Sequence, residues 1–558
     1  MVHKLLRFIG KEVGGLHEAA YLLGFFTLLS QILALLRDRL LAASFGASGT
    51  LDTYYAAFRI PDFIFISVGS MVSVSVLIPF LMERMKSGTE DGRRFISNIF
   101  SFFFLIIVLA SITAFFLTPY LSSVLFPGFS SASLDQVVVL TRILLLSPIF
   151  LGISNLLGTL TQAYKRFFIY ALSPILYNLG IIAGVVFLYP VFGPVGLAYG
   201  VIAGAFLHFA IQIPFIIECG MFPRFTFRYK FKEIRQVLVV SLPRTFTLGA
   251  DSLSMIFLLS IASIMASGSI AIFTFSYNLQ SVPLSVIGVS YSLAAFPILV
   301  KLFGNGNKDE FIDRIVVSAR HIIFWTIPIA TLFIVLRAQI VRTILGSGEF
   351  DWVATRLTAA ALAVFSISLV FQSLTLLFVR AYYATGSTAK PFIAKALNAL
   401  TTVALGYVFM IMFERFPPFR NFLETILRVK DVPGSVMLAL PLAWSVGEFL
   451  NTVALWVVFQ KDFKGFSQRV ARTAGETLAA SAAMGVVAYF LLDLFDNIFD
   501  INTFFGIFFQ GFAAGTIGIL VGVILLLIFK NKELGDIVST LKKRIWKVEI
   551  IPSDSMPQ

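Results

Sequence analysis

The chain has 558 residues, of which 58% are hydrophobic and 13% charged, and its formal net charge is +13 at pH 7. A mean hydropathy of +0.90 excludes an ordinary soluble domain, and the single cysteine, Cys219, excludes an intrachain disulfide framework. Long apolar stretches recur along the whole length and predict an all-α, polytopic membrane protein. We interpret the positive charge as basic cytoplasmic loops and expect no nucleic-acid partner.

The predicted elements are membrane-spanning helices, each of which needs about 20 mostly apolar residues. The first 20 residues lack the apolar core and cleavage site of a signal peptide, so we expect a cytoplasmic N-terminal segment. About fourteen spans follow, at residues 21–45, 53–82, 94–118, 136–163, 168–190, 194–217, 236–264, 269–300, 316–337, 356–384, 391–413, 435–459, 472–494 and 503–529.

The loops between these spans alternate in charge. Loops such as ERMKSGTEDGRR (83–94), PRFTFRYKFKEIR (223–235) and QKDFKGFSQR (460–469) are basic, whereas FGASGT, PGFSSASLDQ and YPVFGPV have no lysine or arginine. The positive-inside rule therefore predicts that both termini are cytoplasmic. Two outer loops depart from the pattern: 336–352 has charges at helical spacing and suits an amphipathic surface segment, and 414–435 suits a short external insertion.

Charged residues in the first span stand out because a charge near the bilayer centre costs roughly 2.5–3.5 kcal/mol on insertion scales. Arg37, Asp38 and Arg39 follow about fifteen uncharged residues, and Arg37 lies about 24 Å along a helix that starts near Tyr21. One interpretation is that these residues face a polar pathway inside the bundle. The other is an Arg–Asp pair that snorkels to the outer interface.

Other spans carry isolated charges as well. Arg59 precedes Pro61 in the second span, where the proline frees backbone groups. Arg244 and Asp251 are seven residues apart in the seventh span and so share a face, although Arg244 could also snorkel to the nearby cytoplasmic interface. Glu448 lies in the middle of the twelfth span. Lys395 lies near the start of the eleventh, where we expect an interfacial position.

Nine prolines fall within or at the ends of spans, and together with the intramembrane arginines they favour a carrier with bent helices. No Walker-type phosphate loop is present, and the four histidines, at positions 3, 17, 208 and 321, lack metal-ligand spacing. Paired carboxylates for hydrolysis are not evident either. We therefore expect no enzyme activity, no metal site and no cofactor.

Several stretches resemble the MurJ (MviN) family of lipid II flippases, in the multidrug/oligosaccharidyl-lipid/polysaccharide exporter superfamily. The main one is LLSQILALLRDRLLAASFGASGTLDTYYAAFRIPDF, with an Arg-Asp pair, then Phe-Gly, then an acid before a basic-x-Pro segment. FPGF (126–129), SPILYN (173–178), AAFPIL (294–299), LRAQIVRTILGSGEF (336–350) and RAYYATGSTAKP (380–391) fit in the same order. The resemblance covers roughly residues 20–530.

The resemblance implies two six-helix lobes around a central cationic cavity, followed by two further helices. We accordingly expect an N-terminal lobe at 21–235, a C-terminal lobe at 236–465, two helices at 466–530 and a cytoplasmic basic tail at 531–558. It also implies a flippase that moves an undecaprenyl-diphosphate-linked peptidoglycan precursor to the outer leaflet for cell-wall biosynthesis and cell shape. The expected location is the bacterial inner membrane and the expected form a monomer, coupled to membrane potential or an ion gradient.

Carried over residue by residue, the resemblance assigns the substrate cavity. Arg37 and Asp38 match the pair of the first span, Asp52 the loop acid and Arg59 the basic residue before the proline. The family has cavity arginines where this chain has Gln31, Phe65 and Asn278, and we hypothesise that Arg244 substitutes for them. The expected cavity residues are Arg37, Asp38, Asp52, Arg59, Arg244, Asp251, Asn278 and Gln31.

Two alternatives stay open at this point. The missing arginines suit a related exporter of another polyprenyl-linked oligosaccharide or of a drug, and a drug exporter would use acids such as Asp38, Asp251 and Glu448. A membrane enzyme acting on lipid-linked sugars, or a membrane scaffold, is the third possibility. Binding of labelled lipid II compared with other polyprenyl diphosphates discriminates among them.

Overall fold

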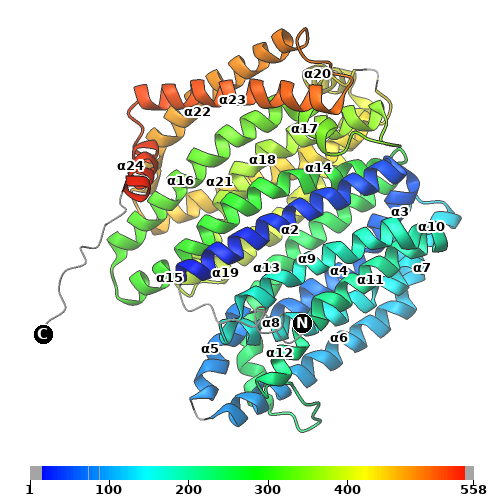
Figure 1. Ribbon diagram of the computed structural model, residues 1–558, viewed down its shortest axis with the longest axis vertical. Helices are drawn as coiled ribbons and strands as arrows, with labels where there is room; N and C mark the ends of the chain where they lie inside the picture. The colour runs from blue at the N-terminus through cyan, green and yellow to red at the C-terminus, as the bar shows by residue number, and fades with distance from the viewer. Residues whose placement is uncertain (1–15, 73, 87, 431, 547–558) are drawn as a thin grey trace, which may run out of the picture. The chain divides into compact units, whose positions relative to one another are not determined.

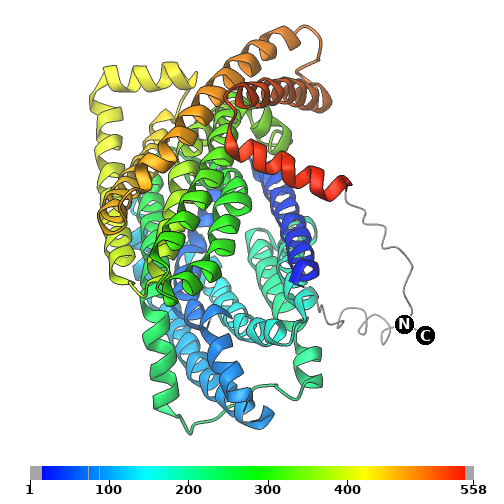
Figure 2. The ribbon, with the colours of Figure 1, turned by 90° about the vertical axis from the view of Figure 1, so that its left-hand side faces the viewer.

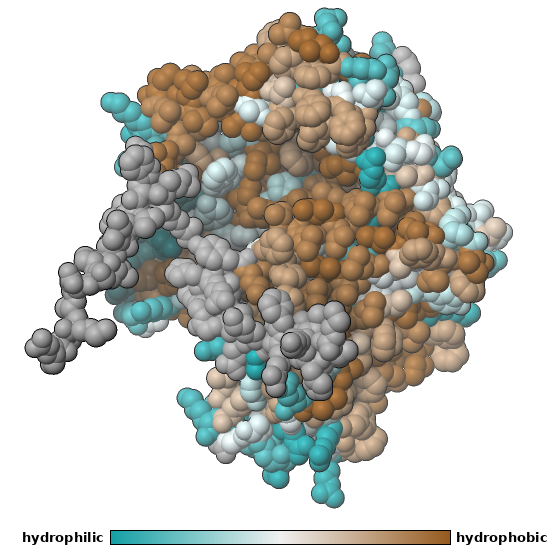
Figure 3. All heavy atoms as spheres, viewed as in Figure 1, coloured by the Kyte–Doolittle hydropathy of each residue, from teal (hydrophilic) through white to brown (hydrophobic). Residues whose placement is uncertain are grey.

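The computed structural model describes residues 16–72, 74–86, 88–430 and 432–546. Within these ranges every regular element is a helix, and twelve helices are long and apolar enough to cross a membrane (Figure 1). The atoms of the face in Figure 3 are largely apolar along the helices, and hydrophilic residues gather at the helix ends. The prediction of an all-α, polytopic membrane protein is confirmed.

The predicted count of fourteen adds two segments to these twelve helices. One is α2 (Leu16–Phe45), which carries the charges at 37–39, and the other is the predicted second span. The second span is interrupted, because a π-helix and a 3₁₀ turn separate its α-helical pieces. The exact number of fourteen stays a prediction.

The described residues divide into two compact units. The first unit holds the residues up to Val282 together with Val341–Phe365 and Ser387–Asn451, and the second holds Pro283–Ile340, Ser366–Gly386 and the residues from Thr452 onward. Helices α17 (Arg337–Ile344), α18 (Trp352–Ala384) and α21 (Ala439–Asp462) contribute residues to both units. The division into lobes between residues 235 and 236 stays a prediction.

The first unit contains most of the helices. In chain order they are α2, α3 (Gly49–Ala57), α4 (Arg59–Ile64), η1 (Phe65–Gly69), η2 (Ser70–Val72), α5 (Val74–Met85), α6 (Thr89–Leu125), α7 (Ser131–Leu144), α8 (Leu146–Ala163), α9 (Phe167–Ala183), η3 (Gly184–Leu188), α10 (Tyr189–Phe192), α11 (Pro194–Ala210), α12 (Ile213–Glu218), α13 (Phe231–Ser263), nearly all of α14 (Ser269–Pro283), α19 (Ala389–Arg415), α20 (Pro417–Leu427) and η5 (Ser435–Leu438).

The second unit contains η4 (Leu284–Val289), α15 (Ser290–Gly304), α16 (Lys308–Val335), α22 (Phe466–Phe495), α23 (Phe504–Ile528) and α24 (Lys532–Trp546). Helices α22 and α23 run side by side (Figure 1). An ion pair between Arg320 Nε and Glu533 Oε1, at 2.7 Å, links α16 to the start of α24. The predicted tail at 531–558 thus begins with a helix.

The two segments predicted as unusual outer loops each contain a short helix. Segment 336–352 contains α17, which confirms helical structure where the charges have helical spacing. Segment 414–435 contains α20, which turns sharply away from the end of α19 (Figure 2). The position of either helix relative to a membrane surface stays a prediction.

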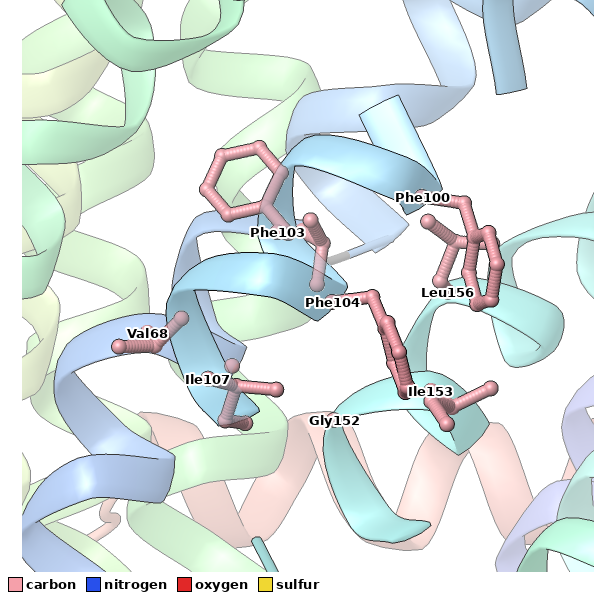
Figure 4. A pocket seen from close by; sticks show the side chains of 10 residues that line it. Val68, Phe100, Phe103, Phe104, Ile107, Gly152, Ile153 and Leu156 are labelled. Carbon is pink, nitrogen blue, oxygen red and sulfur yellow. The ribbon is translucent and has the colours of Figure 1, made fainter. Parts of the chain in front are cut away.

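The break in the second span packs against α6 and α8. Val68 and Gly69 of η1, together with phenylalanines of α6 and Gly152 of α8, line a small apolar cavity of about 20 Å³ (Figure 4). Gly152 allows the close approach, since a Cβ there would lie 2.7 Å from Cδ1 of Ile107. This packing supports a π-helix that places Arg59 and Phe65 beside the interior of the unit.

Helices α9 and α11 meet through glycines, as in small-xxx-small packing of membrane helices. A Cβ on Gly200 would overlap the backbone of Gly184, and a Cβ on Gly204 would overlap the backbone of Tyr177. The helices can therefore lie this close only without side chains at these positions.

We expect Gly200→Ala to destabilise the protein by about 1–3 kcal/mol, because the methyl group forces α9 and α11 apart. Thermal unfolding of the purified protein in detergent measures the effect. Gly249→Ala on α13 is the matched control: a Cβ there meets nothing within 4 Å, so it should be neutral or slightly stabilising. An equal loss of stability in both variants would show that the contact between α9 and α11 is not tightly packed.

Candidate functional site

The charges at the end of α2 make a hydrogen-bonded network inside the first unit. Nε and Nη2 of Arg37 donate to Oδ1 of Asp38 at 3.0 and 2.8 Å, and Nη1 donates to Oδ1 of Asn178 on α9 at 3.2 Å. Nδ2 of Asn278 on α14 donates to Oδ2 of Asp38 at 2.9 Å. Arg37 and Asp38 thus form an ion pair, and hydrogen bonds tie the pair to two other helices.

Arg39 has a different role from its neighbours. Its Nη1 donates to the backbone oxygen of Thr343 at 2.6 Å, at the C-terminal end of α17. Carbonyl groups at a helix C-terminus have no partner within the helix and carry partial negative charge, which a cation stabilises. Of the three charges in the cluster, Arg39 therefore holds α17.

Two adjoining cavities lie in the first unit, and Arg37 lines the smaller one. Polar surface predominates in the smaller cavity and apolar surface in the larger one. The smaller has a volume of about 220 Å³, and its lining includes Arg37, Arg59, Asp62 and Asn278. The larger has a volume of about 460 Å³, and its described lining residues are Arg59, Asp62, Phe65, Ile66, Asn155, Leu248, Asp251, Ser252, Met255, Tyr277 and Trp444. Arg59 and Asp62 line both cavities. Helices from both predicted lobes contribute to the larger one.

The charge of the described lining is balanced. Arg37, Arg59 and Asp62 line the smaller cavity, and Arg59, Asp62 and Asp251 line the larger one. Phe65 and Asn278, which stand where the family has arginines, are lining residues as well. The strongly cationic lining that the resemblance implied is therefore not present among the described residues.

Two further expected cavity residues are on α2 and α13. Gln31 is half-buried on α2 and is not among the described lining residues of either cavity. Arg244 lies on α13, but its side chain falls outside the described part of the structure. The hypothesis that Arg244 substitutes for a cavity arginine stays a prediction.

Asp52 holds the start of α14. Its Oδ2 accepts a hydrogen bond from the backbone N of Gly268 at 2.6 Å, and its Oδ1 accepts one from the backbone N of Ala271 at 2.9 Å. The carboxylate thus satisfies two N–H groups that the helix cannot pair itself. It is buried and is not among the described lining residues of the two cavities.

A buried ion cluster borders the larger cavity. Nζ of Lys395 on α19 lies 2.9 Å from Oδ1 of Asp251 on α13 and 3.3 Å from Oε1 of Glu448 on α21. Nδ2 of Asn398 also donates to Oε1 of Glu448, at 2.8 Å. Lys395 is therefore buried, and two acids on neighbouring helices compensate its charge inside the protein. Its expected position at a membrane interface stays a prediction.

Sequence reasoning missed several residues of the site. Asp62 lies three residues after Arg59, one helical turn away, and that spacing could have predicted a shared face. No such signal pointed to Tyr54, Tyr177, Asn178 and Trp444. Tyrosine, asparagine and tryptophan often occur in membrane helices where they have no functional role.

Long apolar helices around adjoining cavities, with arginines and acids of the spans in the lining, define a multi-pass membrane transporter. The family model "Lipid II flippase MurJ" matches residues 41–416, well over half of the chain. The chain belongs to the MurJ lipid II flippase family.

Curated relatives agree with this family. The probable lipid II flippase MurJ of Buchnera aphidicola subsp. Schizaphis graminum is 27% identical over 400 residues, which cover 70% of this chain and 77% of the relative. The lipid II flippase MurJ of Burkholderia cenocepacia is 27% identical, covering 69% of this chain and 76% of the relative. The probable lipid II flippase MurJ of Rhizobium tropici is 25% identical, with 83% and 85% covered.

Solved structures support the fold. A lipid II flippase MurJ in an inward closed conformation has a TM-score of 0.70 at 24% identity and covers 93% of this chain and 100% of its own. An inward-facing multidrug resistance MATE family transporter of the MOP superfamily has a TM-score of 0.63 at 14% identity, covering 78% and 96%.

We expect Lys395→Met to destabilise the protein by about 3–5 kcal/mol, because it leaves two carboxylates without their cation. Adding Glu448→Gln should recover part of the loss, since one of the stranded charges is then removed. Thermal unfolding of both variants in detergent measures the difference. If the Lys395→Met variant is as stable as the unaltered protein, the two acids do not depend on Lys395 for charge compensation.

We expect Asp52→Asn to cost about 1–3 kcal/mol, because an amide offers one oxygen to two backbone N–H groups and leaves one of them unsatisfied. Chemical denaturation in detergent measures this loss. Asp493→Asn on α22 is a control at an exposed acid and should change stability by less than about 0.5 kcal/mol. Comparable losses in the two variants would contradict the role assigned to Asp52.

Proposed function

We propose that this chain moves lipid II, the undecaprenyl-diphosphate-linked peptidoglycan precursor, from the inner to the outer leaflet by alternating access. Membership of the MurJ family supports the proposal, as do the twelve apolar helices of a multi-pass inner-membrane protein. The observation that carries it is the meeting of Arg37 and Arg59 at one polar cavity within the spans.

The cargo chemistry explains why these residues matter. A head group with two phosphates and a sugar-peptide moiety cannot cross hydrocarbon, so it needs a polar path. Arginine suits a diphosphate because its planar, permanently charged fork makes bidentate hydrogen bonds. The prenyl tail can stay in the lipid if the path opens sideways to the bilayer.

The larger cavity suits the uncharged parts of the head group. Tyr277 and Trp444 meet edge to face there, with ring centroids 5.5 Å apart, and offer apolar surfaces with polar edges. Asn155 and Ser252 add hydrogen-bonding groups for hydroxyls and amides. Pockets for drug-sized ligands measure about 300–1,000 Å³. The whole head group exceeds that size, so the lining helices must separate during transport.

We further propose a monomer with both termini in the cytoplasm, coupled to membrane potential or an ion gradient. The alternation of basic and neutral loops supports this orientation. Imposing a potential across reconstituted vesicles, and then collapsing it with an ionophore, tests the coupling. Transport at the same rate under both conditions would exclude the membrane potential as the driving force.

A second candidate is export of another polyprenyl-linked oligosaccharide or of a small-molecule drug. The acids Asp62 and Asp251 favour it, because they balance the two arginines of the lining. Competition by other polyprenyl diphosphates and by cationic drugs, in the same transport assay, separates the two candidates.

We expect Arg37→Ala and Arg59→Ala each to lower lipid II transport about 10- to 100-fold, since a hydrogen bond to a charged group is worth about 1.5–3 kcal/mol. Arg59→Lys should be intermediate, because it keeps the charge and loses the fork. Flipping of fluorescent lipid II in reconstituted vesicles measures these effects.

Arg142→Ala provides the matched control. Arg142 also lies within a predicted span, but its Nε donates to the backbone oxygen of Phe115, and it is not among the described lining residues of the two cavities. Its loss should leave transport within about twofold of the unaltered protein. Full transport by both cavity variants would overturn the assignment of the cargo site.

A further inference from the structure

The segment between α12 and α13 has an alternating sequence. Its basic or polar residues Arg224, Thr226, Arg228 and Lys230 alternate with Phe225, Phe227 and Tyr229. The segment forms no helix. In extended backbone, successive side chains point to opposite sides, so such a sequence puts basic groups on one side and aromatic rings on the other.

Helix α6 fixes this arrangement through buried polar side chains. Backbone N–H groups of Arg224 and Thr226 donate to Ser97 Oγ at 2.9 Å and Ser101 Oγ at 2.8 Å. The N–H of Lys230 donates to Asn98 Oδ1 at 3.1 Å. The three α6 residues lie on one face of the helix and are buried. The segment is thus held along α6 in one register.

The basic side lines a pocket of about 290 Å³. Its described lining residues are Glu90, Arg93, Arg94, Ser97, Asn98, Arg224, Thr226, Arg228 and Lys230. Five cations and one acid therefore line the pocket, and Nζ of Lys230 also lies 3.6 Å from Oε1 of Glu233. Glu90 is already bonded to Arg93 and Arg94. No described carboxylate lies within ion-pair distance of Arg224 or Arg228, which leaves both guanidinium groups available to an anion.

Most rings of the aromatic side are exposed. Phe227 is 78% exposed, and Phe225 and the following Phe231 are exposed too, whereas Tyr229 is partly buried and packs on Phe102 of α6. Phe225 packs edge to face on Phe104 of α6, with ring centroids 6.1 Å apart. In Figure 3 hydrophilic residues gather at the lower end of the molecule, where Figure 1 places the ends of α5 and α6. Apolar rings beside basic groups are typical of a membrane interface.

We propose that this pocket binds the phosphate group of an anionic bilayer lipid, held by Arg224 and Arg228, with Phe227 among the acyl chains. Two observations favour a lipid over a soluble phosphate: the exposed rings next to the pocket, and the position of the pocket in a basic loop at the end of a span. Basic clusters beside membrane helices attract anionic lipids of the adjacent leaflet. The site is separate from the two adjoining cavities and is independent of the proposed transport.

Binding of short-chain lipids to the full chain in detergent tests the proposal. The probes are dioctanoyl phosphatidylglycerol, dioctanoyl phosphatidylcholine and the deacylated head group glycerophosphoglycerol. We expect phosphatidylglycerol to bind tightest. The double variant R224Q/R228Q should weaken its binding about 10- to 30-fold, because each basic residue contributes about 1 kcal/mol at such a surface. Both arginines are exposed, so thermal unfolding should stay unchanged.

R469Q/R472Q is the matched control. These arginines line another basic pocket, but Arg469 pairs with Asp313 at 2.6 Å and Arg472 pairs with Glu476 at 2.6 Å. The control also removes two positive charges, but at another place, and it should bind phosphatidylglycerol as tightly as the unaltered protein does. An equal loss in both double variants would mean that binding follows net charge alone, and would overturn the proposal.

The substitution Phe227→Ser distinguishes binding of a lipid from binding of its free anionic head group. It should weaken binding of phosphatidylglycerol about tenfold, since an exposed ring that enters an acyl layer gains the transfer free energy of a buried phenylalanine. It should leave glycerophosphoglycerol unaffected. If the deacylated head group binds as tightly as the lipid, or phosphatidylcholine binds as tightly as phosphatidylglycerol, the pocket is not a site for anionic lipids.

Discussion

A charge inside a membrane protein must be compensated where it lies, and this constraint organises the first unit. Arg37 and Asp38 compensate each other, and amides from α9 and α14 complete their hydrogen bonds. Lys395 is compensated by acids from α13 and α21. Since an uncompensated partner costs several kcal/mol, each cluster holds its helices in one arrangement. The two adjoining cavities are the spaces that these helices enclose.

The balanced charge of the cavities affects how a diphosphate would bind. Arg37 already bonds to Asp38, so an anionic cargo competes with a carboxylate for the same guanidinium group. Because Arg37 is already bonded to Asp38 and Asn178, its net contribution to binding an anion is lower than that of an unpaired guanidinium group. A transporter gains from this, since a cargo that binds too tightly in one state is not released in the other.

Much of the fold could be predicted from the sequence, because long apolar runs and basic loops follow directly from the physics of the bilayer. The interrupted second span could not, since a π-helix at residues 65–69 depends on packing against α6 and α8 rather than on local composition. In the site, Arg37 and Arg59 were predicted as cavity residues and lie together in the lining. Asp52 and Lys395 show the limit: a buried charge needs a partner, but a single sequence does not say which distant residue provides it.

The two acids that pair with Lys395 differ in their exposure to the larger cavity. The Asp251 side chain is 39% exposed and lines the larger cavity, whereas that of Glu448 is 3% exposed. If Asp251 turns toward the cavity, Lys395 keeps Glu448 as its partner, and no buried charge is left uncompensated. If Glu448 were lost instead, Lys395 would depend on the acid that water can reach. Of the two acids, Asp251 can therefore respond to the contents of the cavity while Lys395 keeps its contact with Glu448.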